Sequence, residues 1–88
     1  MLVAQIPPIP PINWIFCVAA LCDPRVNALN TAIVAWAAQQ SKAQSPVMPV
    51  DLHTGYNPAT DTVDGVHAND SGSVKIATNW YNALLPLF

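Results

Sequence analysis

Short apolar segments alternate with longer segments of helical periodicity along this chain. Residues 2–6 and 47–53 are each a brief apolar run beside proline or turn-forming residues, which is typical of strands. Residues 23–42 and 70–85 carry apolar side chains at three- and four-residue spacing, which predicts helices. Strands that alternate with helices favour an α/β layer with parallel strands. The expected order is strand–helix–strand–loop–helix, with the loop at residues 54–70.

Start and stop signals support both helices. Asp23 is expected to be the N-cap of the first helix, with Pro24 in its first turn. Its apolar stripe should face a sheet, whereas Asn27 and Asn30 fall outside the stripe. The stripe consists of Val26, Leu29, Ile33, Trp36 and Ala37. Capping side chains precede the last helix at residues 69–71. Its predicted apolar side consists of Val74, Ala77, Tyr81, Leu84 and Leu85, with Trp80 adjoining.

The composition suggests that these elements do not make a closed core alone. Charged residues are 9% of the chain, against about 25% in an ordinary soluble domain. An 88-residue chain also buries only roughly 60–65% of its unfolded surface, and two strands alone are marginal in water. We therefore expect residues 1–88 to be one incomplete unit of a larger domain, whose other part would cover the apolar faces.

Charge and hydropathy exclude two classes of partner. The three basic residues and the net charge of −2 offer almost nothing for neutralising phosphates, so no nucleic-acid partner is expected. The apolar run at residues 12–22 is too short for a membrane span, and no basic segment precedes it as in a signal peptide. No membrane partner is therefore expected. Cys17 and Cys22 could form a short-loop disulfide or remain buried thiols.

The long loop contains a spacing that can serve acid–base chemistry. Asp64 precedes His67 by three residues, and Gly65 permits the tight turn that would bring them together. The carboxylate can then accept from one imidazole nitrogen, which fixes the tautomer and leaves the other nitrogen as a general base. A loop at the carboxyl end of a strand is where α/β enzymes place such groups. Asp64 and His67 are therefore the candidate catalytic residues.

The segment at residues 64–72, DGVHANDSG, resembles the last block of the SGNH/GDSL-type hydrolases, written D-x-x-H-P-N-x-x-G. Residues 3–9, 26–30 and 50–56 look like the preceding strand, helix and strand of the secreted fungal members. Those members are similar to acetylxylan-esterase-like carbohydrate esterases. Ala68 stands in place of the usual proline, and residues 10–22 match least.

The resemblance implies a three-layer α/β/α sandwich, of which residues 1–88 are the C-terminal part. It implies ester hydrolysis by a Ser-Asp-His triad, on acyl or acetyl esters of carbohydrate, in a secreted protein without cofactor or metal. On that template Asp64 orients His67, which takes the proton of a serine. The family's G-D-S block is absent from this chain. We therefore expect the chain to be inactive alone and to need the N-terminal portion of the domain.

Two other interpretations compete with this one. Asp51 and His53 lie two residues apart on a strand, so both side chains point to one face, and with the later acidic and histidine residues they could bind a divalent cation. The further members of that set are Asp61, Asp64 and His67. Alternatively the chain is a non-catalytic remnant or a carbohydrate-binding fragment, with Trp14, Trp36 and Trp80 as stacking candidates. Core packing is the favoured role of Trp36 and Trp80, and Tyr56 is a candidate for the wall of a substrate cleft.

Overall fold

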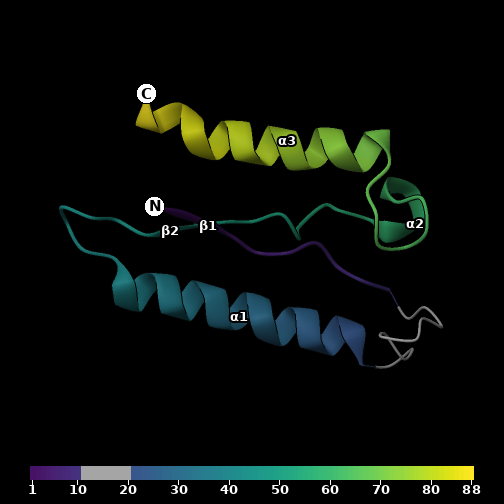
Figure 1. The fold of residues 1–88 in the computed structure, drawn as a ribbon, viewed down its shortest axis with the longest axis horizontal. Helices are drawn as coiled ribbons and strands as arrows, with labels where there is room; N and C mark the ends of the chain where they lie inside the picture. Colours follow the sequence, from purple (N-terminus) through teal and green to yellow (C-terminus); the bar gives the residue numbers. More distant parts are fainter. Residues whose placement is uncertain (11–20) are drawn as a thin grey trace.

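A computed structural model describes residues 1–10 and 21–88. Two long helices lie on opposite sides of a thin sheet, so the described chain forms three layers (Figure 1). The elements in chain order are β1 (Leu2–Ala4), α1 (Cys22–Gln40), β2 (Met48–Val50), α2 (Pro58–Asp61), α3 (Asp70–Leu84) and the 3-10 turn η1 (Leu85–Leu87). The predicted α/β class and the order strand–helix–strand–loop–helix are confirmed.

The sheet consists of β1 and β2, which pair in parallel. Both strands are three residues long, shorter than predicted, although backbone hydrogen bonds from Gln5 and Met48 extend the pairing. Two features of the sequence limit β2. Pro49 has no N–H to donate, and Asp51 Oδ1 accepts from the N–H groups of His53 and Thr54, which turns the chain. The carboxyl ends of both strands therefore point toward α2.

Helix α1 begins at Cys22, and its N-cap lies two residues earlier than predicted. Leu21 is the N-cap and cannot accept a side-chain hydrogen bond, so the prediction of Asp23 as N-cap is wrong. Asp23 lies instead in the first turn, where a negative charge favours the helix dipole. Cys22 is buried, whereas Cys17 and Trp14 lie outside the described residues. The predicted alternatives for Cys17 and Cys22, a disulfide or two buried thiols, therefore lie outside the described residues.

The face that α1 buries includes a polar residue. Asn30 is buried, and its side-chain amide accepts from the N–H of Ile6 at 2.8 Å and donates to the carbonyl of Ile6 at 2.9 Å. Ile6 has left the sheet because Pro7 follows it, so its peptide groups need these partners. The prediction that Asn30 lies off the buried stripe is wrong. Trp36 is 43% exposed, which also overturns its predicted core position.

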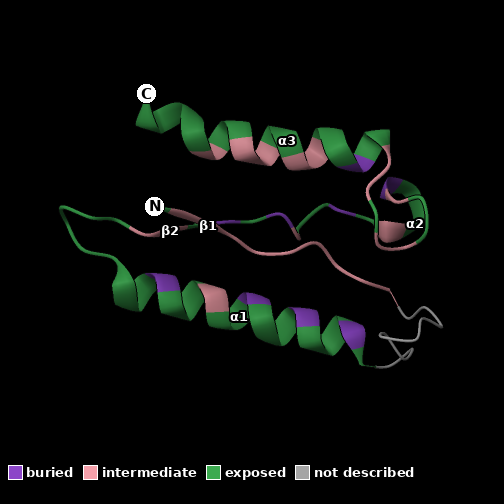
Figure 2. Cartoon of the chain, viewed as in Figure 1, coloured by how far each residue is buried: buried purple, intermediate pink, exposed green. Residues whose placement is uncertain are grey.

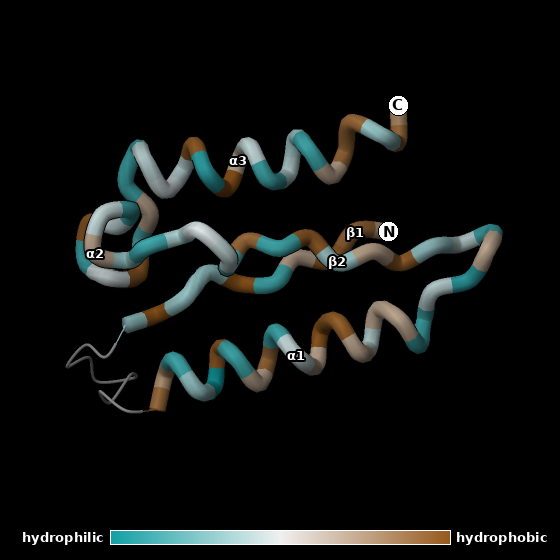
Figure 3. Tube along the Cα trace, turned by 180° about the vertical axis from the view of Figure 1, so that it is seen from behind, coloured by the Kyte–Doolittle hydropathy of each residue, from teal (hydrophilic) through white to brown (hydrophobic). Residues whose placement is uncertain are grey.

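The face of α3 that turns inward also differs from the prediction. Val74, Tyr81 and Leu85 are exposed, while Gly72 is buried (Figure 2). Asn79 reaches the carbonyl of Asp51 at 3.1 Å, and this polar contact points toward the strands. Hydrophobic residues occur along both long helices (Figure 3), and several of their large apolar side chains stay exposed. No helix among the described residues is long and apolar enough to cross a membrane.

Helix α2 occupies part of the segment that was predicted to be a loop. Asn57 is its N-cap and accepts from the N–H of Ala59 at 3.0 Å, with Pro58 in the first turn. A four-residue helix leaves almost no periodicity in the sequence, which explains why it was missed. The predicted cap of α3 is confirmed, because Asn69 accepts from the N–H of Gly72 at 3.0 Å.

Candidate active site

Residues 62–68, between α2 and α3, fold back as a small hairpin that an antiparallel bridge closes at its two ends. Inside the hairpin the N–H of Val63 donates to the carbonyl of His67 at 2.8 Å. Gly65 has a φ of 94°, and its N–H donates to Thr62 Oγ1 at 2.7 Å. A residue with a Cβ would be strained at this φ. The hairpin therefore has the tight turn that the sequence predicted.

Asp64 and His67 meet within this hairpin. His67 Nδ1 lies 2.6 Å from Asp64 Oδ2. The other carboxylate oxygen, Oδ1, accepts from the backbone N–H groups of His67 at 2.7 Å and Val66 at 2.9 Å. One oxygen thus fixes the loop while the other holds the imidazole ring. The predicted contact between the carboxylate and one ring nitrogen is confirmed.

The electrostatics of the pair follow from these contacts. The pKa of Asp64 lies well below its usual value, because the backbone N–H and the side chain of His67, followed by the N–H of Val66, stabilise the ionised carboxylate. The side chain of His67 is 70% exposed and that of Asp64 is 38% exposed. An ionised carboxylate therefore orients an imidazole that substrates can reach. This arrangement suits a general base, whose catalytic role stays a prediction.

A second carboxylate lies beside the hairpin and is almost completely buried. Asp61 is 1% exposed. Its Oδ2 accepts from Lys75 Nζ at 2.7 Å and from the N–H of Asn57 at 2.8 Å, and its Oδ1 accepts from Ser71 Oγ at 2.7 Å. Lys75, then Asn57 and Ser71, lower the pKa of Asp61 to about 2. The sequence pattern predicted Asp61 only as a possible metal ligand and did not indicate this cluster.

One signal in the sequence could have indicated the Asp61 cluster. Ser71 and Lys75 are four residues apart, so they share one face of α3. A lysine and a serine on one helix face can together bind a carboxylate. Because the sequence does not reveal helix α2, however, it does not predict that Asp61 lies opposite that face.

The five residues of the metal hypothesis are not brought together. Among the described residues, no group of three or more histidine, cysteine, aspartate or glutamate side chains is placed to hold a metal ion. Asp51 is engaged in its turn, and Asp61 is occupied by Lys75. The arrangement of the described residues therefore gives the metal hypothesis no support.

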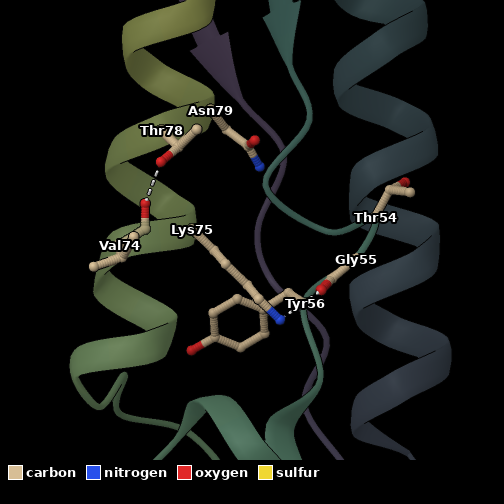
Figure 4. Close-up of a pocket in the computed structure, with 7 residues that line it drawn as sticks. All are labelled: Thr54, Gly55, Tyr56, Val74, Lys75, Thr78 and Asn79. Carbon is tan, nitrogen blue, oxygen red and sulfur yellow. Dashed lines mark hydrogen bonds between the residues drawn. The ribbon is translucent and has the colours of Figure 1, made fainter.

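Tyr56 and Lys75 line a surface cavity of about 280 Å³ between α3 and the segment after β2 (Figure 4). Lys75 crosses it and donates to the carbonyl of Gly55 at 3.0 Å. Tyr56 is 8% exposed, its hydroxyl donates to the Asp61 carbonyl at 3.3 Å, and burial raises its pKa. Tyr56 therefore packs between the elements and also lines the cavity, so its predicted place in the wall of a substrate cleft stays a prediction.

No protein-family model and no curated protein matches this chain. Two solved structures do. One is an acetyl esterase variant, in which a serine is replaced by alanine, with an acetate ion. The other is a carbohydrate esterase family 3 protein from Talaromyces cellulolyticus. Each is 32% identical to this chain and superposes with a TM-score of 0.76 over 98% of it.

This chain spans 38% of the length of either solved structure. It has the fold of the C-terminal part of a larger esterase domain. The resemblance to carbohydrate esterases that the sequence predicted is thereby confirmed.

Proposed function

We propose that this chain supplies the Asp-His half of a Ser-Asp-His triad in an SGNH/GDSL-type ester hydrolase. The observation that carries the proposal is the 2.6 Å contact between His67 Nδ1 and Asp64 Oδ2 in a tight hairpin. Its support is the likeness to an acetyl esterase and a carbohydrate esterase over nearly the whole chain. The proposed substrates are acetyl or other acyl esters carried on carbohydrate.

In the proposed mechanism His67 carries a proton from the nucleophile to the leaving group. A serine hydroxyl attacks the ester carbonyl while His67 Nε2 takes its proton, and Asp64 stabilises the imidazolium that forms. His67 then returns the proton to the departing alcohol, which leaves an acyl-serine. Water then attacks the acyl-serine while His67 takes one of its protons, and His67 returns that proton to the serine oxygen as the bond to the acyl group breaks and the carboxylic acid leaves. The ionised state of Asp64 suits this role, because a charged partner favours the protonated ring.

The nucleophile is proposed to come from the N-terminal portion of an esterase domain. Two serines of this chain already have hydrogen-bonding roles in the fold. Ser71 Oγ donates to Asp61 Oδ1, and Ser41 Oγ accepts from the N–H of Val47. None of the serines lies in a G-D-S block. The partner that completes the triad is therefore proposed to be a segment that carries such a block.

The proposed location is outside the cell. The support is the similarity to secreted fungal members and the scarcity of charged residues, which are 9% of the chain. Fractionation of the source culture tests this location with an antibody against residues 43–88. Recovery from the medium supports it, and recovery from the cells alone rejects it.

A chimera tests the proposed chemistry directly. The C-terminal part of the Talaromyces esterase that aligns with this chain is replaced by residues 1–88, and hydrolysis of a chromogenic acetyl ester is measured. We expect turnover well above buffer, which His67→Ala removes. A Ser73→Ala chimera is the matched control, because this exposed residue has no proposed catalytic part.

Each outcome of the chimera experiment has one meaning. Circular dichroism and thermal unfolding establish first that the chimera and its variants fold. A folded chimera without activity, or one whose activity persists in His67→Ala, rejects the proposed function. Activity toward acetylated xylan as well as the small ester would support carbohydrate as the carrier of the acyl group. Activity toward the small ester alone would limit the proposal to simple esters.

A further inference from the structure

The Asp61 carboxylate connects three parts of the chain that surround the hairpin. Lys75 and Ser71 reach it from α3, and the N–H of Asn57 reaches it from the residue before α2. Both carboxylate oxygens therefore have partners. Asp61 itself is the last residue of α2, immediately before the hairpin begins.

The backbone of Asp61 makes a second set of contacts. Its carbonyl accepts from the N–H of Asn69 at 3.0 Å, and Asn69 is the residue immediately after the hairpin. The side-chain amide of Asn69 also donates to the carbonyl of Thr60 at 2.9 Å. The two ends of the hairpin are thus fixed to each other through the residue that carries the buried carboxylate.

The packing around this carbonyl leaves no room for adjustment. A Cβ built on Gly72 would lie 2.1 Å from the Asp61 carbonyl oxygen, so α3 approaches the end of α2 at backbone distance. The hydroxyl of Tyr56 also donates to this oxygen. A shift of Asp61 would therefore move both the first turn of α3 and the start of the hairpin.

We infer that Asp61 and Lys75 are positioning residues for His67. Their ion pair, in which the carboxylate is buried and the Lys75 side chain is 43% exposed, fixes the end of α2 against α3. This contact sets the base of the 62–68 hairpin and with it the geometry of the Asp64–His67 contact. Neither residue touches the reacting atoms. The positioning role rests on the proposed function of His67. The contacts among Asp61, Lys75 and the ends of the hairpin are present whether or not an ester is hydrolysed.

The charge of the pair argues for positioning over simple stabilisation. Because the Lys75 side chain is 43% exposed, solvent weakens its attraction to Asp61, and the buried Asp61 carboxylate loses hydration. Such a pair adds little net stability over an apolar pair of similar size. A charged network with satisfied partners holds its groups in one geometry, since every hydrogen bond has a preferred direction. Here three donors from two segments converge on one carboxylate.

Nitrogen NMR of the full chain tests the inference. The ¹⁵N shifts of His67 are recorded in the parent, Asp61→Asn and Lys75→Met, at a pH where the ring is neutral. In the parent we expect the Nδ1–H tautomer, since Nδ1 faces the Asp64 carboxylate. In both variants we expect the two nitrogen shifts to move toward each other, because a loosened hairpin lets the tautomers exchange.

Two further variants separate positioning from general destabilisation. Lys75→Arg keeps the charge and should keep most of the parental tautomer signature. Asn30→Ala removes two hydrogen bonds to Ile6 on the α1 side of the sheet, and should lower the unfolding midpoint without changing the His67 shifts. Where Asp61→Asn or Lys75→Met alone does not fold, the Asp61→Asn/Lys75→Met double variant replaces it, because no buried charge is left unpaired.

Parental His67 shifts in a folded Asp61→Asn or double variant overturn the inference. Equal shift changes in Asn30→Ala overturn it too, since the effect would then follow stability alone. The test is separate from that of the proposed function. If the chimera is inactive but Asp61→Asn alters the His67 tautomer in the 88-residue chain, only the esterase proposal is rejected. If the chimera is active but Asp61→Asn leaves the tautomer unaltered, only the positioning role is rejected.

Discussion

At the scale of single residues, the two oxygens of Asp64 have different tasks. Oδ1 binds the backbone of the hairpin and Oδ2 binds the ring of His67. All these partners lie within three residues, so the sequence was sufficient to predict the pair. Asp61 was missed because its partner Lys75 is 14 residues away, beyond the 62–68 hairpin, and because the short helix α2 that ends at Asp61 leaves no pattern in the sequence.

Replacing Asp64 by asparagine in the chimera should reduce kcat and leave KM nearly unchanged. The amide retains the size of the side chain but can donate to Nδ1 and so favour the wrong tautomer. By analogy with triad enzymes the loss should be about 10⁴-fold. Steady-state hydrolysis of the acetyl ester measures both constants. A loss below tenfold would mean that Asp64 does not orient the base.

Acid should destabilise the chain through Asp61. Its pKa is about 2 in the folded chain against an ordinary value of 3.8, so ionisation favours the folded state above that ordinary value. This contribution is lost as the pH falls from about 4 to about 2. Asp64 is shifted in the same direction. Urea unfolding across this range should show a falling midpoint in the parent and a smaller fall in Asp61→Asn. Equal falls would contradict the prediction.

At the scale of elements, the sequence located the helices well but placed their inner faces less well. The predicted range of α1, residues 23–42, is close to the observed Cys22–Gln40. Apolar periodicity misplaced Asn30, because a buried amide that satisfies a peptide group is indistinguishable from a surface amide in the sequence. The same limit applies to α3, whose orientation depends on polar contacts of Lys75 and Asn79 with distant residues.

Gly72→Ala should separate α3 from α2. The added Cβ would meet the Asp61 carbonyl oxygen at 2.1 Å, and backbone on both sides leaves no flexible side chain to yield. Overpacking of this kind costs about 1–3 kcal/mol of unfolding free energy, and occasionally more. Urea unfolding measures the cost. Ser73→Ala is the control in the same turn and should stay within about 0.5 kcal/mol of the parent. A neutral Gly72→Ala would show that α3 can shift freely.

At the scale of the whole molecule, the three layers are thin and elongated and do not form a closed globule. Its radius of gyration is 14.4 Å, whereas a compact domain of this length has about 12 Å. Large apolar side chains on both long helices stay exposed, including Leu29, Trp36, Val74 and Tyr81. These observations agree with a chain that spans 38% of each similar esterase structure.

The purified 88-residue chain should not hydrolyse a chromogenic acetyl ester faster than buffer. His67 is oriented and accessible, but a general base accelerates the reaction only when a nucleophile and oxyanion donors face the same carbonyl. Ser71 lies in the same motif, yet its hydroxyl donates to the buried Asp61. The measurement compares the chain with His67→Ala and with buffer. Turnover that disappears in His67→Ala would mean that the chain holds its own nucleophile, and Ser71→Ala and Ser73→Ala would then identify it.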